Sequence, residues 1–113
     1  MKFVKEFVEK REKELKKIDF YFKILKKNAR KVLGKDTKIF VFGSFARKKD
    51  FNPFSSDVDI LIFSPKVKNE LGKKVKVKEA IEKNNLPTFF EIHLANEETF
   101  SYYKFFCKEL KEI

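Results

Sequence analysis

Two short groups of polar residues in the middle of the chain have the types and spacing that phosphate chemistry needs. The first is Gly43-Ser44, which directly follows the apolar run of residues 39–42. A glycine at a strand exit lets the backbone approach a ligand closely, and the turn after it offers unpaired amides for phosphate oxygens. Arg47 and Lys48 could neutralise the charge of those oxygens. We interpret the segment as a candidate phosphate cradle, although such a bend is more often only a turn.

The second group is Asp57-Val58-Asp59, at the start of an apolar run. Because side chains alternate along a strand, Asp57 and Asp59 are predicted to share one face and Val58 to lie on the other. Two carboxylates at this spacing repel each other unless a cation neutralises them. Hard cations such as Mg²⁺ use one or two carboxylates together with phosphate oxygens. The pair therefore predicts a metal site; the alternative is a solvated polar face of an edge strand.

A third acid, Glu91, stands alone in the apolar run of residues 89–94. An isolated carboxylate is costly to bury unless it is paired or binds a metal. If its strand neighbours that of Asp59, three carboxylates could hold two metal ions about 3.5–4 Å apart and orient an attacking hydroxyl. His93 shares the strand face of Glu91, and we interpret it as a packed structural histidine rather than a catalytic one.

The elements that must position these residues begin with a helical apolar pattern from residue 3 to Leu33, followed by Gly34, which suits a helix C-terminus. One straight helix of this length would overshoot so small a domain. We expect either two pieces broken near Asp19, which could cap the second, or one long helix whose first half packs on a partner.

Three β-rich runs, residues 38–42, 58–63 and 89–94, are predicted strands. A helix is predicted between the second and third, from about Val75 until Asn84 and Asn85 stop it. A last helix is predicted from a cap at Asn96 or Thr99 to about Lys111. This order indicates an α/β or α+β layer in which helices cover a small sheet.

Composition sets the outer limits of the interpretation. The 113 residues allow one domain, and the single cysteine, Cys107, excludes an intrachain disulfide and a thiolate-rich zinc site. No apolar run approaches the roughly 20 residues of a membrane-spanning helix. The first ten residues lack the continuous apolar stretch of a secretory signal. We therefore expect a cytoplasmic protein with no membrane association.

The chain carries 27 basic and 17 acidic residues, a net charge of +10, which attracts polyanions. The excess is spread over the predicted helices and forms no arginine-rich tract. A nucleic-acid-binding role stays open as an alternative, and so does a simple compositional bias toward lysine.

Together, the string FGSFARKKDFNPFSSDVDILIF resembles the signature of the DNA polymerase beta-like nucleotidyltransferase superfamily. That signature is an apolar residue, Gly-Ser, a short spacer and Asp-x-Asp in an apolar strand. Here twelve residues separate Ser44 from Asp57. The Ala-Arg pair after the bend and the serine before Asp57 are similar, more narrowly, to the minimal nucleotidyltransferases of bacteria and archaea. The resemblance covers about residues 36–95.

The resemblance implies an α+β, nucleotidyltransferase-like fold: a small mixed sheet of three to four strands flanked by helices, with a long or broken N-terminal helix. Residues 1–34 would form a helical segment that packs on the core or on a partner. Residues 35–113 would form the catalytic core of a single domain.

It also implies roles for individual residues. Asp57 and Asp59 would bind two Mg²⁺ ions, and Glu91 would bind one of them and help to activate the acceptor hydroxyl. The residues that hold the nucleoside triphosphate would be Gly43, Ser44, Arg47 and Lys48. The sequence departs from the family pattern at Glu91, where aspartate is frequent, and at Lys48, where glycine is frequent. These departures bear on metal geometry and on the phosphate loop.

The family reaction moves a nucleoside monophosphate from a nucleoside triphosphate to a hydroxyl and releases pyrophosphate. Minimal members are often paired with a HEPN-domain ribonuclease toxin and transfer AMP from ATP to one of its tyrosines, acting as antitoxin. We expect this activity, with the acceptor supplied by a HEPN-type partner. A homodimer through the aromatic residues of the last predicted helix, and a non-catalytic module that inhibits by contact alone, are the alternatives.

Overall fold

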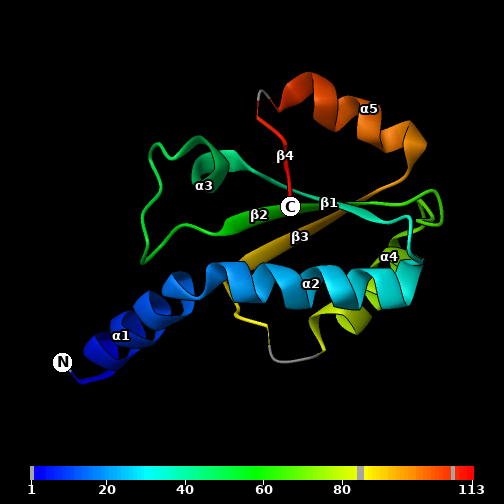
Figure 1. The fold of residues 1–113 in the computed structure, drawn as a ribbon. Coiled ribbons are helices and arrows are strands. Elements are labelled where there is room, and N and C mark those ends of the chain that lie inside the picture. The colour runs from blue at the N-terminus through cyan, green and yellow to red at the C-terminus, as the bar shows by residue number, and fades with distance from the viewer. Residues whose placement is uncertain (1, 84–85, 108) are drawn as a thin grey trace.

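The computed structural model describes residues 2–83, 86–107 and 109–113 (Figure 1). A four-stranded sheet with the order β3-β2-β1-β4 forms its centre. Strands β1 (Lys38–Phe42) and β2 (Val58–Phe63) are antiparallel, β2 and β3 (Phe90–Ala95) are parallel, and the short β4 (Lys111–Glu112) pairs antiparallel with β1. The predicted α+β class with a small mixed sheet is thus confirmed.

Two helices, α1 (Lys2–Lys16) and α2 (Ile18–Leu33), precede the sheet, so the predicted break in the N-terminal helix is confirmed. The predicted cap was wrong. Lys17 occupies the N-cap position of α2 without a side-chain hydrogen bond, and Asp19 lies inside the first turn. A carboxylate there still favours the helix, because it faces the positive end of the helix dipole. Gly34 ends α2 with a φ of 108°, as the sequence predicted.

One face of the sheet packs on α2 and on α4 (Leu71–Glu82), which lie on the same side (Figure 1). Alternation along each strand turns its aliphatic side chains toward these helices, and full burial of each contributes about 1.5–3 kcal/mol. The predicted stop of α4 at Asn84 and Asn85 lies outside the described residues; α4 begins four residues earlier than predicted. The buried core consists chiefly of Leu25, Ala29, Leu33, Ile39, Val41, Val58, Ile60, Ile62, Ile81, Phe90, Ile92 and Leu94.

The opposite face is partly covered by α5 (Glu97–Phe106), seen above the sheet in Figure 1. The Phe100 ring of α5 stacks on Phe40 and Phe63, with ring centroids 5.3 and 4.5 Å apart. Asn96 caps this helix in a reciprocal capping box with Thr99, which confirms the predicted start.

The predicted end of this last helix at Lys111 was wrong. The helix ends at Phe106, and Lys111–Glu112 pairs with β1 instead. The Ile113 amide donates a hydrogen bond to the Ile39 carbonyl, and the Ile113 side chain packs on the core. These contacts outweigh a further helical turn, because they satisfy the free edge of β1 and bury an aliphatic side chain.

Helix α1 projects from the body of the molecule (Figure 1), and Phe3, Val4 and Phe7 in its first half are exposed. Leu15 packs against the core, and the Arg11 guanidinium donates hydrogen bonds to the carbonyls of Phe54 and Ser56. Arg11 thereby ties α1 to the segment that leads into β2. Among the described helices, none combines the length and apolar character that crossing a membrane requires.

Candidate active site

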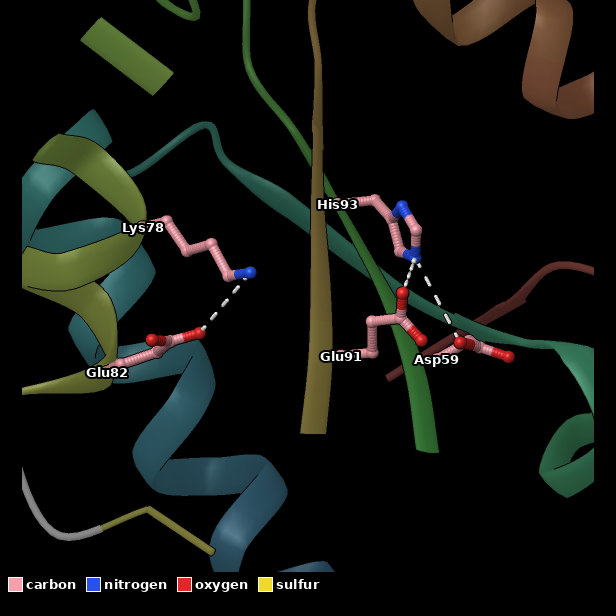
Figure 2. A network of polar contacts seen from close by, with 5 residues as sticks. All are labelled: Asp59, Lys78, Glu82, Glu91 and His93. Atoms are coloured by element: carbon pink, nitrogen blue, oxygen red, sulfur yellow. Dashed lines mark ion pairs between the residues drawn. The ribbon is translucent and has the colours of Figure 1, made fainter. Parts of the chain in front are cut away.

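The parallel pairing of β2 and β3 brings two of the predicted acids together. Asp59 lies directly opposite Glu91 in the register, and Leu61 lies opposite His93. Alternation therefore turns Asp59, Glu91 and His93 toward the same face of the sheet, where Figure 2 shows their side chains converging. One ligand atom from each of the three lies within 4.8 Å of the others. The strand of Glu91 thus neighbours that of Asp59, which was the condition for the two acids to share a site.

The bend after β1 closes the site from the other side. Phe42, the last residue of β1, is the register partner of Asp59, so Gly43 follows immediately beside that carboxylate. Gly43 has a φ of 74°, and a Cβ at this position would overlap Asp59 Oδ2. Only glycine satisfies both the left-handed backbone and the close approach. The Gly43 backbone and the Asp59 carboxylate are therefore in close packing contact.

The other predicted phosphate-binding residues lie in α3 (Gly43–Arg47) and at its end. Ser44 is half-buried in the first turn, and Arg47 is exposed beside a cavity of about 510 Å³ that Gly43 also lines. Lys48 is exposed at the C-cap of α3 with a φ of 55°. A left-handed backbone conformation explains why glycine is frequent at this position in the family, because the Cβ of Lys48 causes steric strain that glycine avoids.

Asp57 lies apart from the other two acids. It precedes the first paired residue of β2, its side chain is exposed, and it lies outside the cluster of Asp59, Glu91 and His93. Its charge still reaches the cluster, because it raises the pKa of Asp59. The structure thus brings Asp59 and Glu91 together and leaves Asp57 at the entrance to the strand.

Electrostatics at the site disfavour the ionised form of Asp59. Partial burial raises the pKa of the Asp59 carboxyl, and the Glu91 carboxylate raises it further through its charge and a side-chain hydrogen bond. Asp57 acts in the same direction, whereas His93 lowers the pKa. Several anionic groups are therefore held together at a cost that a bound cation would relieve.

The structure also places His93 beside the two acids. Its Nε2 lies 3.9 Å from Asp59 Oδ1 and 3.7 Å from Glu91 Oε1. Its ring also packs edge-on against Phe42 and Tyr103, with centroids 5.3 and 6.1 Å away, so the expected packing role is real. Sequence alternation had placed Glu91 and His93 on one strand face, and the pairing of β3 with β2 brings both beside Asp59.

The donor set fits a divalent cation. Divalent ions bind oxygen and nitrogen ligands at about 2.0–2.2 Å, so two ligands at roughly 90–120° from each other lie about 2.8–3.8 Å apart. The separations of His93 Nε2 from the two carboxylates match or slightly exceed this range. The Gly43 bend lies directly against one of these carboxylates, that of Asp59.

A mixed sheet that sets an acidic strand pair against a glycine-serine bend defines a domain suited to phosphoryl or nucleotidyl transfer. A family model described as nucleotidyltransferase domain matches residues 21–113, from α2 to the end of the chain. The chain belongs to this family, in agreement with its resemblance to the minimal nucleotidyltransferases of the DNA polymerase beta-like superfamily. The searches of curated proteins and of solved structures gave no match.

Proposed function

We propose that this protein transfers a nucleoside monophosphate from a nucleoside triphosphate, AMP from ATP, to a hydroxyl acceptor with release of pyrophosphate. The observation that supports the proposal most strongly is the position of Asp59, with Glu91 directly opposite it on β3 and Gly43 packed against it from β1. Nucleotidyl transfer needs positioning and charge neutralisation more than covalent catalysis, and this arrangement offers both.

On this proposal the bend binds the triphosphate. Gly43 lets the backbone pass beside Asp59, so the amides that follow can reach phosphate oxygens, and the Ser44 hydroxyl adds a donor. Arg47 lies along the adjoining cavity and neutralises charge on the departing pyrophosphate. Lys48 adds a positive charge at the exposed end of α3.

Asp57, Asp59 and Glu91 would hold two Mg²⁺ ions, which when bound neutralise the phosphate oxygens and lower the pKa of the attacking hydroxyl. Asp59 is the central ligand because it lies between Gly43 and Glu91. Glu91 is more exposed, with half of its side chain accessible, so it can also accept the proton of an incoming hydroxyl. Asp57 stands at the open side of the site.

The acceptor is proposed to be a tyrosine of a HEPN-type toxin, with this protein as its antitoxin. Support comes from the aromatic side chains on α5: Tyr102, Phe105 and Phe106 are exposed, and Phe106 lines the same cavity as Gly43 and Arg47. An apolar surface next to the site suits a protein that carries the acceptor. A second copy of this chain is the alternative occupant of that surface.

The test is a transfer assay with ATP labelled at the α-phosphate, in Mg²⁺, with a candidate HEPN protein as acceptor. The wild type should release pyrophosphate and label the acceptor, and mass spectrometry should find AMP on a tyrosine. Asp59→Asn and Glu91→Gln should each lower the rate by about 100-fold or more, as losing a metal ligand does. The exposed, distant Asp36→Asn is the matched control and should retain full activity.

A separate arm addresses the non-catalytic alternative. If the double variant Asp57→Asn/Asp59→Asn neutralises the toxin as well as the wild type does, inhibition works by contact and catalysis is not the mechanism. If no nucleoside triphosphate labels any acceptor although the protein binds Mg-ATP, the transfer activity is refuted.

A further inference from the structure

His93 faces the two acids of the site in a way that the transfer chemistry above leaves unused. It lies two residues beyond Glu91 on β3, and its Nε2 points to both Asp59 and Glu91 (Figure 2). About 31% of its side chain is accessible, against 25% for Asp59, so neither group is sealed from solutes. An ion could therefore enter between them.

The distances from His93 Nε2 to the two carboxylates fit coordination of a shared metal ion better than direct hydrogen bonds. A hydrogen bond from an imidazole N–H to a carboxylate would have a nitrogen–oxygen separation of about 2.7–3.2 Å. Here both separations, 3.7 and 3.9 Å, exceed that range and are nearly equal. His93 Nε2 is thus nearly equidistant from the two carboxylates, at separations close to those between two ligands of one ion with metal–ligand bonds of about 2.0–2.2 Å.

The orientation of the imidazole ring is built into the fold. Phe42 of β1 and Tyr103 of α5 pack edge-on against it from the protein side. These contacts restrict the rotation of the ring while Nε2 remains directed at the carboxylates. A ligand held in position before the ion arrives loses less conformational entropy on binding.

We propose that His93 Nε2 is a direct metal ligand beside Asp59 and Glu91, and that this mixed donor set makes the site prefer Mn²⁺ to Mg²⁺. The inference rests on the proposed divalent-cation site and changes which ion it selects. Mg²⁺ takes oxygen ligands almost exclusively and keeps its waters, whereas imidazole suits transition-metal ions. Mn²⁺ accepts both carboxylate and imidazole, and so matches all three donors.

The sequence provides a direct probe, because His93 is its one histidine. Pulsed electron paramagnetic resonance on the Mn²⁺-loaded protein detects a coordinated imidazole nitrogen through its magnetic coupling to the ion. We expect the wild type to show this coupling and a sample labelled with ¹⁵N-histidine to show it with the ¹⁵N pattern. Absence of imidazole coupling in wild-type protein that has bound one Mn²⁺ would overturn the proposal without any variant.

Affinity gives the second readout, by titration with Mn²⁺ alone and by competition with Mg²⁺. The wild type should bind Mn²⁺ at least about 10-fold more tightly than Mg²⁺. His93→Gln should weaken Mn²⁺ binding by about 10–100-fold and change Mg²⁺ binding by less than about 3-fold. Tyr103→Phe, which keeps the ring beside His93, is the matched control and should bind both ions as the wild type does. Equal loss of both ions, or no loss, in a folded His93→Gln protein would contradict the proposal.

This proposal and the transfer activity can fail separately. If Mn²⁺ binds without a nitrogen ligand but Mg-ATP still supports transfer, only the role of His93 is wrong. If the nitrogen coupling is present but no nucleotide is transferred with either ion, the metal site stands and the proposed function is wrong.

Discussion

At the scale of single residues, Asp59 is repelled by the neighbouring carboxylates and is also closely packed against Gly43. Asp59 is pressed between the Gly43 backbone and the Glu91 carboxylate, and its pKa is raised mainly because it is partly buried. Such a carboxylate destabilises the folded state whenever it is ionised. Asp59 therefore lowers the stability of the folded state at neutral pH, and a bound cation would offset that loss.

One prediction concerns how this carboxylate makes stability depend on pH. The unfolded Asp59 titrates near 3.8, and its folded pKa is higher. Between the two values the folded state holds the extra proton, so stability should fall as pH rises through that window and then stay constant. In EDTA, Asp59→Asn should raise the urea midpoint at pH 7 and leave it nearly unchanged at pH 3. A variant less stable than wild type at pH 7 would contradict the account.

A second prediction compares two glycines. Gly43→Ala places a Cβ against Asp59 in a left-handed backbone, so it should cost about 1–3 kcal/mol in unfolding free energy and displace the carboxylate. Gly72→Ala, in α4, meets no atom within 4 Å and should gain about 0.5–1 kcal/mol, because alanine is the better helix former. Urea denaturation measures both. Equal effects at the two positions would show that the fit of Gly43 against Asp59 is unimportant.

At the scale of elements, the parallel pairing of β2 and β3 decides which side chains meet. Period-two patterns in the sequence indicate both strands and the face of each acid. They do not tell that the strands are neighbours, nor that Asp59 stands opposite Glu91 rather than two residues away. That register comes from the crossover through α4 and from the core it buries. The proximity of His93 to Asp59 depends on the same register, which the period-two pattern does not give.

The ends of the chain show a similar limit. Strand β4 has two residues, too few for any periodic signal, so the last helix was predicted to continue through it. The start of α5 could be predicted because a capping box is a local signal between Asn96 and Thr99. Local chemistry was predictable, and pairing between distant segments was not.

The third prediction tests whether the Asn96 cap stabilises the N-terminus of α5. Asn96→Ala removes the cap and the hydrogen bond to the Val67 carbonyl, so it should cost about 1–2 kcal/mol in unfolding free energy. Amide exchange should accelerate in the first turn of α5. Asn69→Ala, which loses only an exposed bond to Glu98, is the control and should cost less than about 0.5 kcal/mol. If the two variants were equally stable, the cap would not anchor the helix.

At the scale of the whole molecule, two of the exposed apolar surfaces lie on the first and the last helix. One surface is the projecting half of α1, with Phe3, Val4 and Phe7, and the other is the aromatic end of α5. Only the second lies next to the site, through the cavity that Phe106 shares with Gly43.

The fourth prediction concerns the coupling of cation binding to global stability. A cation that binds only the folded state at 100 times its dissociation constant adds about 2.7 kcal/mol, which corresponds to a rise in Tm of roughly 10 °C for a domain of this size. Mn²⁺ should produce this rise in the wild type, and EDTA should reverse it. The double variant Asp59→Asn/Glu91→Gln should not respond, whereas Glu6→Gln/Glu9→Gln, on exposed α1 positions, should respond fully. A rise that survives in the first variant would place the ion elsewhere.

We propose that one site, formed by Asp59, Glu91 and the Gly43-Ser44 bend, holds both the ion and the triphosphate. The most direct measurement is a crystal structure with Mn²⁺ and a non-hydrolysable ATP analogue, using the anomalous signal of the ion. We expect an anomalous peak within about 2.2 Å of oxygens of Asp59 and Glu91, with the triphosphate against the bend. A nucleotide bound elsewhere, or a peak that Asp59 does not touch, would contradict it.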